Sequence, residues 1–125
     1  MGKLAEKIAK SFRRWFHKEK AAFTYGRVRI VESMTDIPNE LGWEVFIVSR
    51  NGAPRWAVIK CPCGCGERLN VNLMRSANPH WNLSMRRGRV SLSPSLWVSQ
   101  AKCESHFWLR DNGVYWCGKL SDNFV

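Results

Sequence analysis

The sequence lacks the long apolar segments that would place it in or across a membrane. Its 125 residues contain no run of about eighteen apolar residues, and the first residues hold no apolar signal-peptide core. They also contain no internal repeat, no low-complexity stretch and no obvious linker between two domains. We therefore expect a cytoplasmic protein built around one folded domain.

Acidic residues are scarce, because ten Asp and Glu residues face twenty Lys and Arg residues and leave a net charge of +10. This excess predicts an anionic partner, either nucleic acid or an acidic protein surface. Much of it lies in residues 1–22, where Leu4, Ile8 and Phe12 recur at helical spacing. We predict a basic amphipathic helix there, either packed on a domain of residues 23–125 or docked onto a partner, nucleic acid or an acidic membrane surface.

After residue 22 the pattern changes to short alternating stretches separated by tight turns. Asn51-Gly52, Arg87-Gly88 and Asn112-Gly113 are turn signals, because Asn and Gly tolerate positive φ. A short helix or turn fits residues 36–41. The predicted fold is mainly β, a small antiparallel sheet or barrel-like domain, with strands over residues 25–31, 43–50, 55–60, 69–73, 81–85, 90–92, 106–110 and 114–117.

The last hairpin makes a further prediction about two side chains. If Asn112 and Gly113 are the two central residues of the turn, Trp108 faces Cys117. His106 and Cys117 are then diagonal neighbours on one face of the sheet. A slip of one residue would move Cys117 to the other face.

The five cysteines are an odd number and are clustered, which argues against a disulfide framework. Three of them occupy the hexapeptide Cys61-Pro62-Cys63-Gly64-Cys65-Gly66, and Cys103 follows some forty residues later. Thiolates at this spacing suit one structural zinc ion, and the glycines let the backbone turn around it. We predict zinc ligands at Cys61, Cys63, Cys65 and Cys103, with His106 and Cys117 as alternative ligands. The competing interpretation is a set of small buried thiols.

Three segments of the chain are informative together: Cys61 to Gly66, the segment Val90-Ser91-Leu92-Ser93-Pro94-Ser95-Leu96, and Cys103-Glu104-Ser105-His106-Phe107-Trp108 followed by Asn112-Gly113-Val114. In this order they resemble a bacterial family of small zinc-binding domains long without an assigned function. Members of this family are often encoded beside bacterial ubiquitin-like modifiers and their conjugating enzymes. The resemblance covers roughly residues 25–116. It implies a zinc-stabilised domain that acts as a peptidase on a ubiquitin-like protein or its conjugates.

A serine peptidase needs a hydroxyl nucleophile, a base within hydrogen-bond reach, a group that orients the base, and oxyanion donors. Our candidate base is His106, beside Cys103, and our candidate nucleophile is Ser95, because Pro94 fixes the chain before it and the resemblance includes this segment. Ser93 is the second choice. Further candidates are Ser91, Ser99 and Ser105 as nucleophile, His80 and His17 as base, and Glu32, Glu67, Glu104 and Asp111 as orienting carboxylate. The serines also suit an ordinary loop.

The rival interpretation is a non-catalytic zinc-binding module. Seven tryptophans accompany the twenty basic residues, and aromatic and basic side chains together can bind single-stranded nucleic acid. The best local basic patch is Arg75, Arg86, Arg87 and Arg89. Such a surface equally suits an acidic protein partner. A zinc hydrolase is less favoured, because a thiolate-rich ligand set belongs to closed structural sites.

Overall fold

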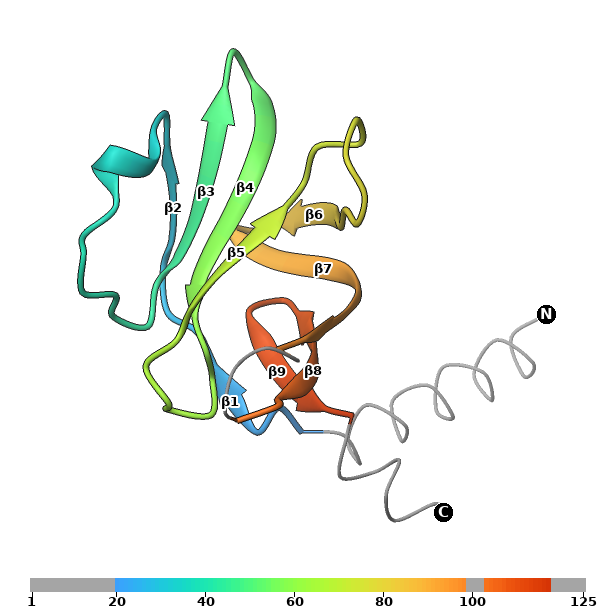
Figure 1. Cartoon of the computed structure of the whole chain (residues 1–125). Helices are drawn as coiled ribbons and strands as arrows, with labels where there is room; N and C mark the ends of the chain where they lie inside the picture. The colour runs from blue at the N-terminus through green and yellow to red at the C-terminus, as the bar shows by residue number, and fades with distance from the viewer. Residues whose placement is uncertain (1–19, 99–102, 118–125) are drawn as a thin grey trace, which may run out of the picture.

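The computed structural model describes residues 20–98 and 103–117. The amphipathic helix predicted over residues 1–22 falls almost entirely outside the described residues, as do the candidates His17 and Ser99. In the described part the fold is mainly β, as predicted, and it consists of two sheets (Figure 1). No helix in that part is long and apolar enough to cross a membrane.

The first sheet has the strand order β2-β3-β4-β5. It contains β2 (Val28–Val31), β3 (Val45–Arg50), β4 (Ala53–Lys60) and β5 (Arg68–Asn72). The β3–β4 hairpin turns at Asn51-Gly52, and both residues have positive φ, as the sequence predicts. One pairing differs from the antiparallel prediction, since β2 runs parallel to β3.

The parallel pair follows from the connection between the two strands. Residues 32–44 carry the chain back along the sheet and include a short 3-10 helix, η1 (Met34–Asp36), instead of the helix or turn predicted over residues 36–41. Ser33 caps η1, because its side chain accepts a hydrogen bond from Thr35 N while Asp36 accepts from Ser33 N. The helix ends at Asp36, where Ile37 turns into the core and Pro38 follows.

The second sheet has the order β1-β9-β8-β7-β6 and is antiparallel throughout. Its strands are β1 (Phe23–Thr24), β6 (Asn82–Arg86), β7 (Arg89–Trp97), β8 (His106–Arg110) and β9 (Gly113–Trp116). The bounds of β8 are those expected from the sequence. The stretch predicted as one strand over residues 25–31 is divided, because Tyr25 N bonds to Asn112 O and leaves β1 in one sheet and β2 in the other.

The core lies between the two sheets, and a smaller second cluster covers the outer face of the first sheet. Val45 and Ile47 face the main cluster, whereas Phe46 and Val48 face Ile37 in the second cluster. Strand β3 is therefore buried on both faces, which explains its continuous apolar run. The second sheet buries only one face, and its other face carries the candidate site.

The β8–β9 hairpin corrects one prediction. Arg110 pairs with Gly113, so the central turn residues are Asp111 and Asn112, with φ of 47° and 66°, and not Asn112-Gly113. Asn112 is buried, and its side chain bonds to Val90 N at 2.8 Å and Gly26 O at 2.7 Å. Gly113 is required for close packing, because a Cβ there would lie 3.0 Å from the Cβ of Ala21.

Candidate active site and metal centre

Ser95 lies in an irregular part of β7. Leu92 pairs with Leu109 and Leu96 pairs with Phe107, so three residues of β7 lie opposite the single residue Trp108 of β8. Two extra residues preserve the alternation of faces, and Leu92 and Leu96 both remain in the core. Ser95 therefore belongs to the outer face of the sheet, where it is half-buried.

Two features suit this segment to an irregular strand. Pro94 has no N–H group, so it cannot complete a regular ladder. The indole Nε1 of Trp81 donates a hydrogen bond to the carbonyl oxygen of Ser95 at 3.2 Å. This contact satisfies a backbone group that the strand pairing leaves out and holds Ser95 from the neighbouring loop.

His106 begins β8 and faces Trp97 across the strand pair. Its Nε2 atom lies 2.8 Å from the Oγ atom of Ser95. The indole of Trp97 stacks on the imidazole, with ring centroids 5.3 Å apart and planes inclined by 15°. Trp97 is 66% exposed, so the stacked pair of rings lies at the surface of this sheet face. Ser95 and His106 are thus in the geometry that a nucleophile and its base require.

Cys117 completes this group on the outer face. Its backbone N donates to the carbonyl oxygen of His106 at 2.9 Å, so the two residues are directly opposite and not diagonal neighbours. They share a face, as the sequence predicts. Burial raises the pKa of the Cys117 thiol, while the positive charge of Arg110 and a hydrogen bond with the Ser95 side chain lower it. The thiol is therefore next to the Ser95 hydroxyl.

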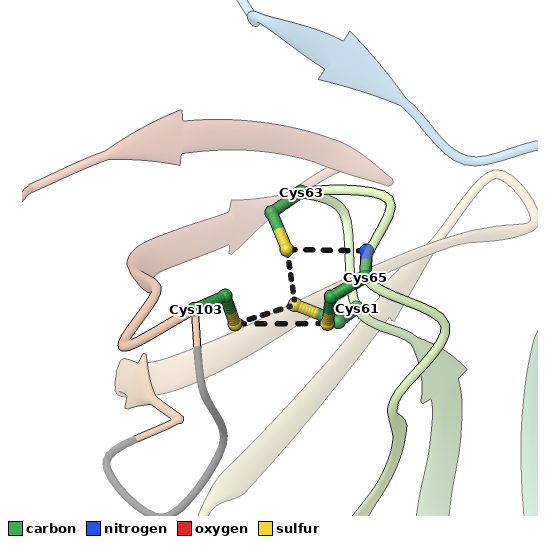
Figure 2. A group of neighbouring side chains, drawn as sticks. All are labelled: Cys61, Cys63, Cys65 and Cys103. Atoms are coloured by element: carbon green, nitrogen blue, oxygen red, sulfur yellow. Dashed lines mark hydrogen bonds between the residues drawn. The ribbon is translucent and has the colours of Figure 1, made fainter.

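The hexapeptide of residues 61–66 forms the loop between β4 and β5. Cys61 N bonds to Glu67 O at 2.8 Å and Gly64 N to Cys61 O at 3.2 Å, which fold the loop back on itself. Gly64 and Gly66 both have φ of 89°, a conformation that L side chains rarely adopt. These turns direct three sulfur atoms toward Cys103, which precedes β8 (Figure 2).

The four sulfur atoms of Cys61, Cys63, Cys65 and Cys103 all lie within 4.8 Å of one another. The closest separations are 3.4 Å for Cys61–Cys63 and 3.7 Å for both Cys61–Cys103 and Cys65–Cys103. Four thiolates about 2.3 Å from a central zinc ion would be about 3.8 Å apart at tetrahedral angles. The separations fit a bound metal ion, and they exceed the S–S distance of a disulfide, about 2.05 Å.

The thiols of this cluster differ in their environments. Burial raises the pKa of Cys61 to about 12. A hydrogen bond from Ser105 is the main reason that the pKa of Cys103 is lowered to about 6. The backbone N of Cys65 also donates a hydrogen bond to Cys63 Sγ at 3.3 Å.

Ser105 connects the cysteine cluster to the serine and histidine. It is buried, and its hydroxyl lies 3.2 Å from Cys103 Sγ and 3.7 Å from Cys61 Sγ. Its carbonyl oxygen accepts a hydrogen bond from Val98 N at 2.7 Å, and the next residue is His106. The cluster therefore fixes the backbone from which the imidazole projects.

Other candidates lie elsewhere. Ser93 is exposed on the same face, Ser91 accepts a hydrogen bond from Asp111 N at 2.8 Å, and His80 bonds to Asn78 at 3.0 Å in the β5–β6 loop. Among the described residues, no contact joins His106 to Glu32, Glu67, Glu104 or Asp111. The patch of Arg75, Arg86, Arg87 and Arg89 is exposed, and three of its members surround the β6–β7 turn.

Sequence reasoning missed two residues. Trp97 and Trp81 contact the imidazole and the Ser95 carbonyl respectively. Their alternation with apolar neighbours is typical of core residues. The exposure of Trp97 could have been inferred only from knowing that Leu96 faces inward.

The sequence of this chain matches the model of one protein family. A model of the family described as "Bacterial ubiquitination-like system serine protease (BubE)" matches residues 33–117, which is most of the chain. The chain belongs to this family. The match includes all four clustered cysteines, Ser95 and His106. No curated protein and no solved structure gives a significant match.

Proposed function

We propose that this chain is a serine peptidase in which Ser95 is the nucleophile and His106 the general base. The observation that carries the proposal is the 2.8 Å separation between Ser95 Oγ and His106 Nε2 on the open face of the second sheet. The family description, a serine protease of a bacterial ubiquitination-like system, supports the same chemistry.

The proposed reaction follows from these two atoms. His106 Nε2 accepts the hydroxyl proton as Ser95 Oγ attacks the scissile carbonyl carbon, and a tetrahedral oxyanion forms. The protonated imidazole then donates its proton to the leaving amine, and the carbon–nitrogen bond breaks. Water, deprotonated by the same nitrogen, hydrolyses the acyl-serine and restores the hydroxyl.

Contacts around His106 replace the carboxylate that orients the base in a triad. The stacked indole of Trp97 fixes the plane of the ring, and the bond from Cys117 N fixes the backbone. A hydrogen bond between the Cys117 side chain and the Ser95 hydroxyl holds this hydroxyl beside the imidazole. The proposed catalytic unit is therefore the dyad of Ser95 and His106, in which the stacked Trp97 ring orients the imidazole.

The proposed cofactor is a structural zinc ion bound by Cys61, Cys63, Cys65 and Cys103. Four thiolates close the coordination sphere, so the ion has no position for water or substrate. Its proposed contribution is to hold the hexapeptide loop against the chain that leads to His106. Zinc supplies folding free energy here and no step of the hydrolysis.

The proposed substrate is a ubiquitin-like protein, processed at its C-terminal tail or released from its conjugates. This follows from the family description and the sequence resemblance. An open sheet face that carries a half-buried serine suits an extended peptide more than a small enclosed ligand. A cytoplasmic location and the domain boundaries at residues 22 and 23 stay predictions of the sequence.

The test is hydrolysis of a modifier precursor and of a modifier conjugate by purified, metal-loaded protein. Ser95→Ala and His106→Ala are each expected to lower kcat by at least about a thousandfold, because dyad members act as a unit. Ser76→Ala is the control, since Ser76 is an exposed serine of the β5–β6 loop outside the site, and its kcat should stay within about twofold.

Metal content and thermal unfolding of each variant separate the possible outcomes. Both active-site variants should retain the metal and the fold of the wild type. Loss of metal from His106→Ala would assign the imidazole as a ligand and refute the dyad. Unchanged hydrolysis by Ser95→Ala would refute the nucleophile, and a complete lack of hydrolysis by the wild type would favour a non-catalytic binding module.

A further inference from the structure

An open pocket of about 440 Å³ lies on the outer face of the second sheet. Strands β6, β7 and β8 form it, and its lining includes Leu83, Ser91, Ser93, Trp108 and Arg110. Ser93 and Trp108 are each two residues from a member of the proposed dyad, Ser95 and His106 respectively. Trp108 and His106 are two apart on the regularly paired strand β8, hence about 6.5 Å apart on the same face, so the pocket adjoins the dyad.

Arg110 gives the pocket a positive charge. Its guanidinium carbon lies 5.1 Å from the centre of the Trp108 ring, so the side chain lies along the sheet face. Burial raises the pKa of the Cys117 thiol and the charge of Arg110 partly offsets this, so the guanidinium is close enough to act on a neighbour of the dyad. Among the described residues, the one salt bridge joins Arg29 to Glu44. Arg110 therefore forms no salt bridge with a described carboxylate.

We propose that this pocket is a substrate subsite that selects a peptide residue with a carboxylate side chain close to the scissile bond. The inference rests on the proposed peptidase function and names the substrate feature that the site recognises. Arg110 presents a planar donor group that matches a carboxylate. The Trp108 ring contacts the methylene groups of an aspartate or glutamate, and the serine hydroxyls can bond to the peptide backbone.

The distances suit a residue near the bond to be cut. An extended peptide advances about 3.3 Å per residue. A side chain two or three residues from the carbonyl held at Ser95 therefore reaches the pocket. The substrate is thus expected to carry Asp or Glu within three residues of the scissile bond, on the side that runs toward β6.

Binding can be tested apart from hydrolysis by using the Ser95→Ala protein. Six-residue peptides of Gly and Ala with blocked ends, each carrying one Glu, Gln or Lys at a defined position, are titrated while the indole N–H signal of Trp108 is followed by NMR. At one or two positions, the Glu peptide should bind about fivefold more tightly than the Gln peptide, as one exposed ion pair allows.

Substitution of the arginine should remove this preference. Adding Arg110→Gln should bring the Glu and Gln peptides to equal affinity, and adding Arg110→Glu should make the Lys peptide the better ligand. Arg89→Gln is the matched control, because Arg89 is an exposed arginine on β7 outside the pocket. It should keep the preference for Glu.

The two proposals fail in different ways. Equal binding of Glu and Lys peptides at every position, or a Glu preference that survives Arg110→Gln, would overturn the subsite whether or not the protein hydrolyses peptides. A Glu preference that depends on Arg110, in a protein whose wild type cleaves nothing, would support the binding pocket and refute the peptidase.

Discussion

The positions of Ser95 and His106 depend on how the irregular strand β7 pairs with the regular strand β8. His106 holds a regular position opposite Cys117, while Ser95 lies among three residues that face only Trp108. If the Leu92–Leu109 pairing continued without the two extra residues, Ser95 would lie directly opposite His106. The irregularity instead places Trp97 opposite His106, so that the imidazole lies between the stacked indole and the Ser95 hydroxyl.

Trp97 is expected to act as a positioning residue for His106. Trp97→Ala should lower kcat about tenfold, because a stacked aromatic pair contributes about 0.5–1.5 kcal/mol. Since the indole is largely exposed, the midpoint of thermal unfolding should change little. Trp97→Phe should recover most of kcat. A fall in kcat that is accompanied in both variants by a clear fall in the midpoint of thermal unfolding would indicate a purely structural role instead.

Substitution of a clustered cysteine and substitution of Cys117 are expected to have different effects on the metal content of the protein. Cys103→Ser should lose the metal, because its sulfur lies 3.7 Å from those of both Cys61 and Cys65. Cys117→Ser should keep one metal ion per chain, since its side chain contacts Ser95 and not the cluster. Elemental analysis of the purified proteins measures this directly. Metal loss from Cys117→Ser would place Cys117 in the ligand set.

The β8–β9 hairpin is the element that aligns the site, and Asn112 anchors it. Asn112→Ala removes two buried side-chain hydrogen bonds and a residue suited to φ of 66°. We expect a loss of about 2–4 kcal/mol in the free energy of unfolding, measured by urea denaturation.

The control for Asn112 is the corresponding change in the other Asn-containing hairpin. Asn51 is exposed and also has positive φ, but no side-chain hydrogen bond of Asn51 is found in the described part of the chain. Asn51→Ala should cost only about 1 kcal/mol, the backbone contribution alone. Equal losses in the two variants would show that the buried bonds of Asn112 add nothing.

Elements with local signals could be predicted from the sequence. The Asn51-Gly52 and Arg87-Gly88 turns, the bounds of β8 and the alternation of β5 all depend on neighbouring residues. The parallel β2–β3 pair and the two-residue shift in β7 depend on contacts between distant segments, so the sequence pattern does not indicate them. Asn112 was assigned to the wrong turn position because its buried partners, Val90 and Gly26, lie far away in the sequence.

The residues of the candidate site could be predicted from the sequence, but the contacts around them could not. The hexapeptide and Cys103 stand out by composition, and Ser95 and His106 were chosen with help from the family resemblance. The ring of Trp97, the indole bond of Trp81 and the pocket beside Trp108 could not be inferred, because each requires knowledge of which strands are neighbours. Position relative to the sheet face, and not residue type, defines these contacts.

At the scale of the whole molecule, metal binding is expected to couple to folding and to pH. Metal binding must remove the proton from Cys61, whose thiol pKa is raised to about 12, whereas Cys103, with a pKa lowered to about 6, is largely deprotonated at neutral pH. Protons therefore compete with the metal, and metal affinity should rise with increasing pH and fall on acidification.

Chelation provides the measurement of this coupling. A chelator should lower the unfolding temperature and abolish hydrolysis, and zinc should restore both. The chelator concentration needed for half-release should decrease from pH 8 to pH 6. A chelator that leaves both fold and activity unchanged would contradict a structural metal.

Covalent labelling of the wild-type protein by a fluorophosphonate tests the central claim most directly, because such a reagent reacts with a serine activated by a base. Intact-mass and peptide mass spectrometry locate the adduct on metal-loaded, folded protein. The account predicts one adduct per chain, on Ser95, that is absent from His106→Ala although this variant keeps its metal and fold. An adduct on Ser93, or no adduct on active protein, would contradict it.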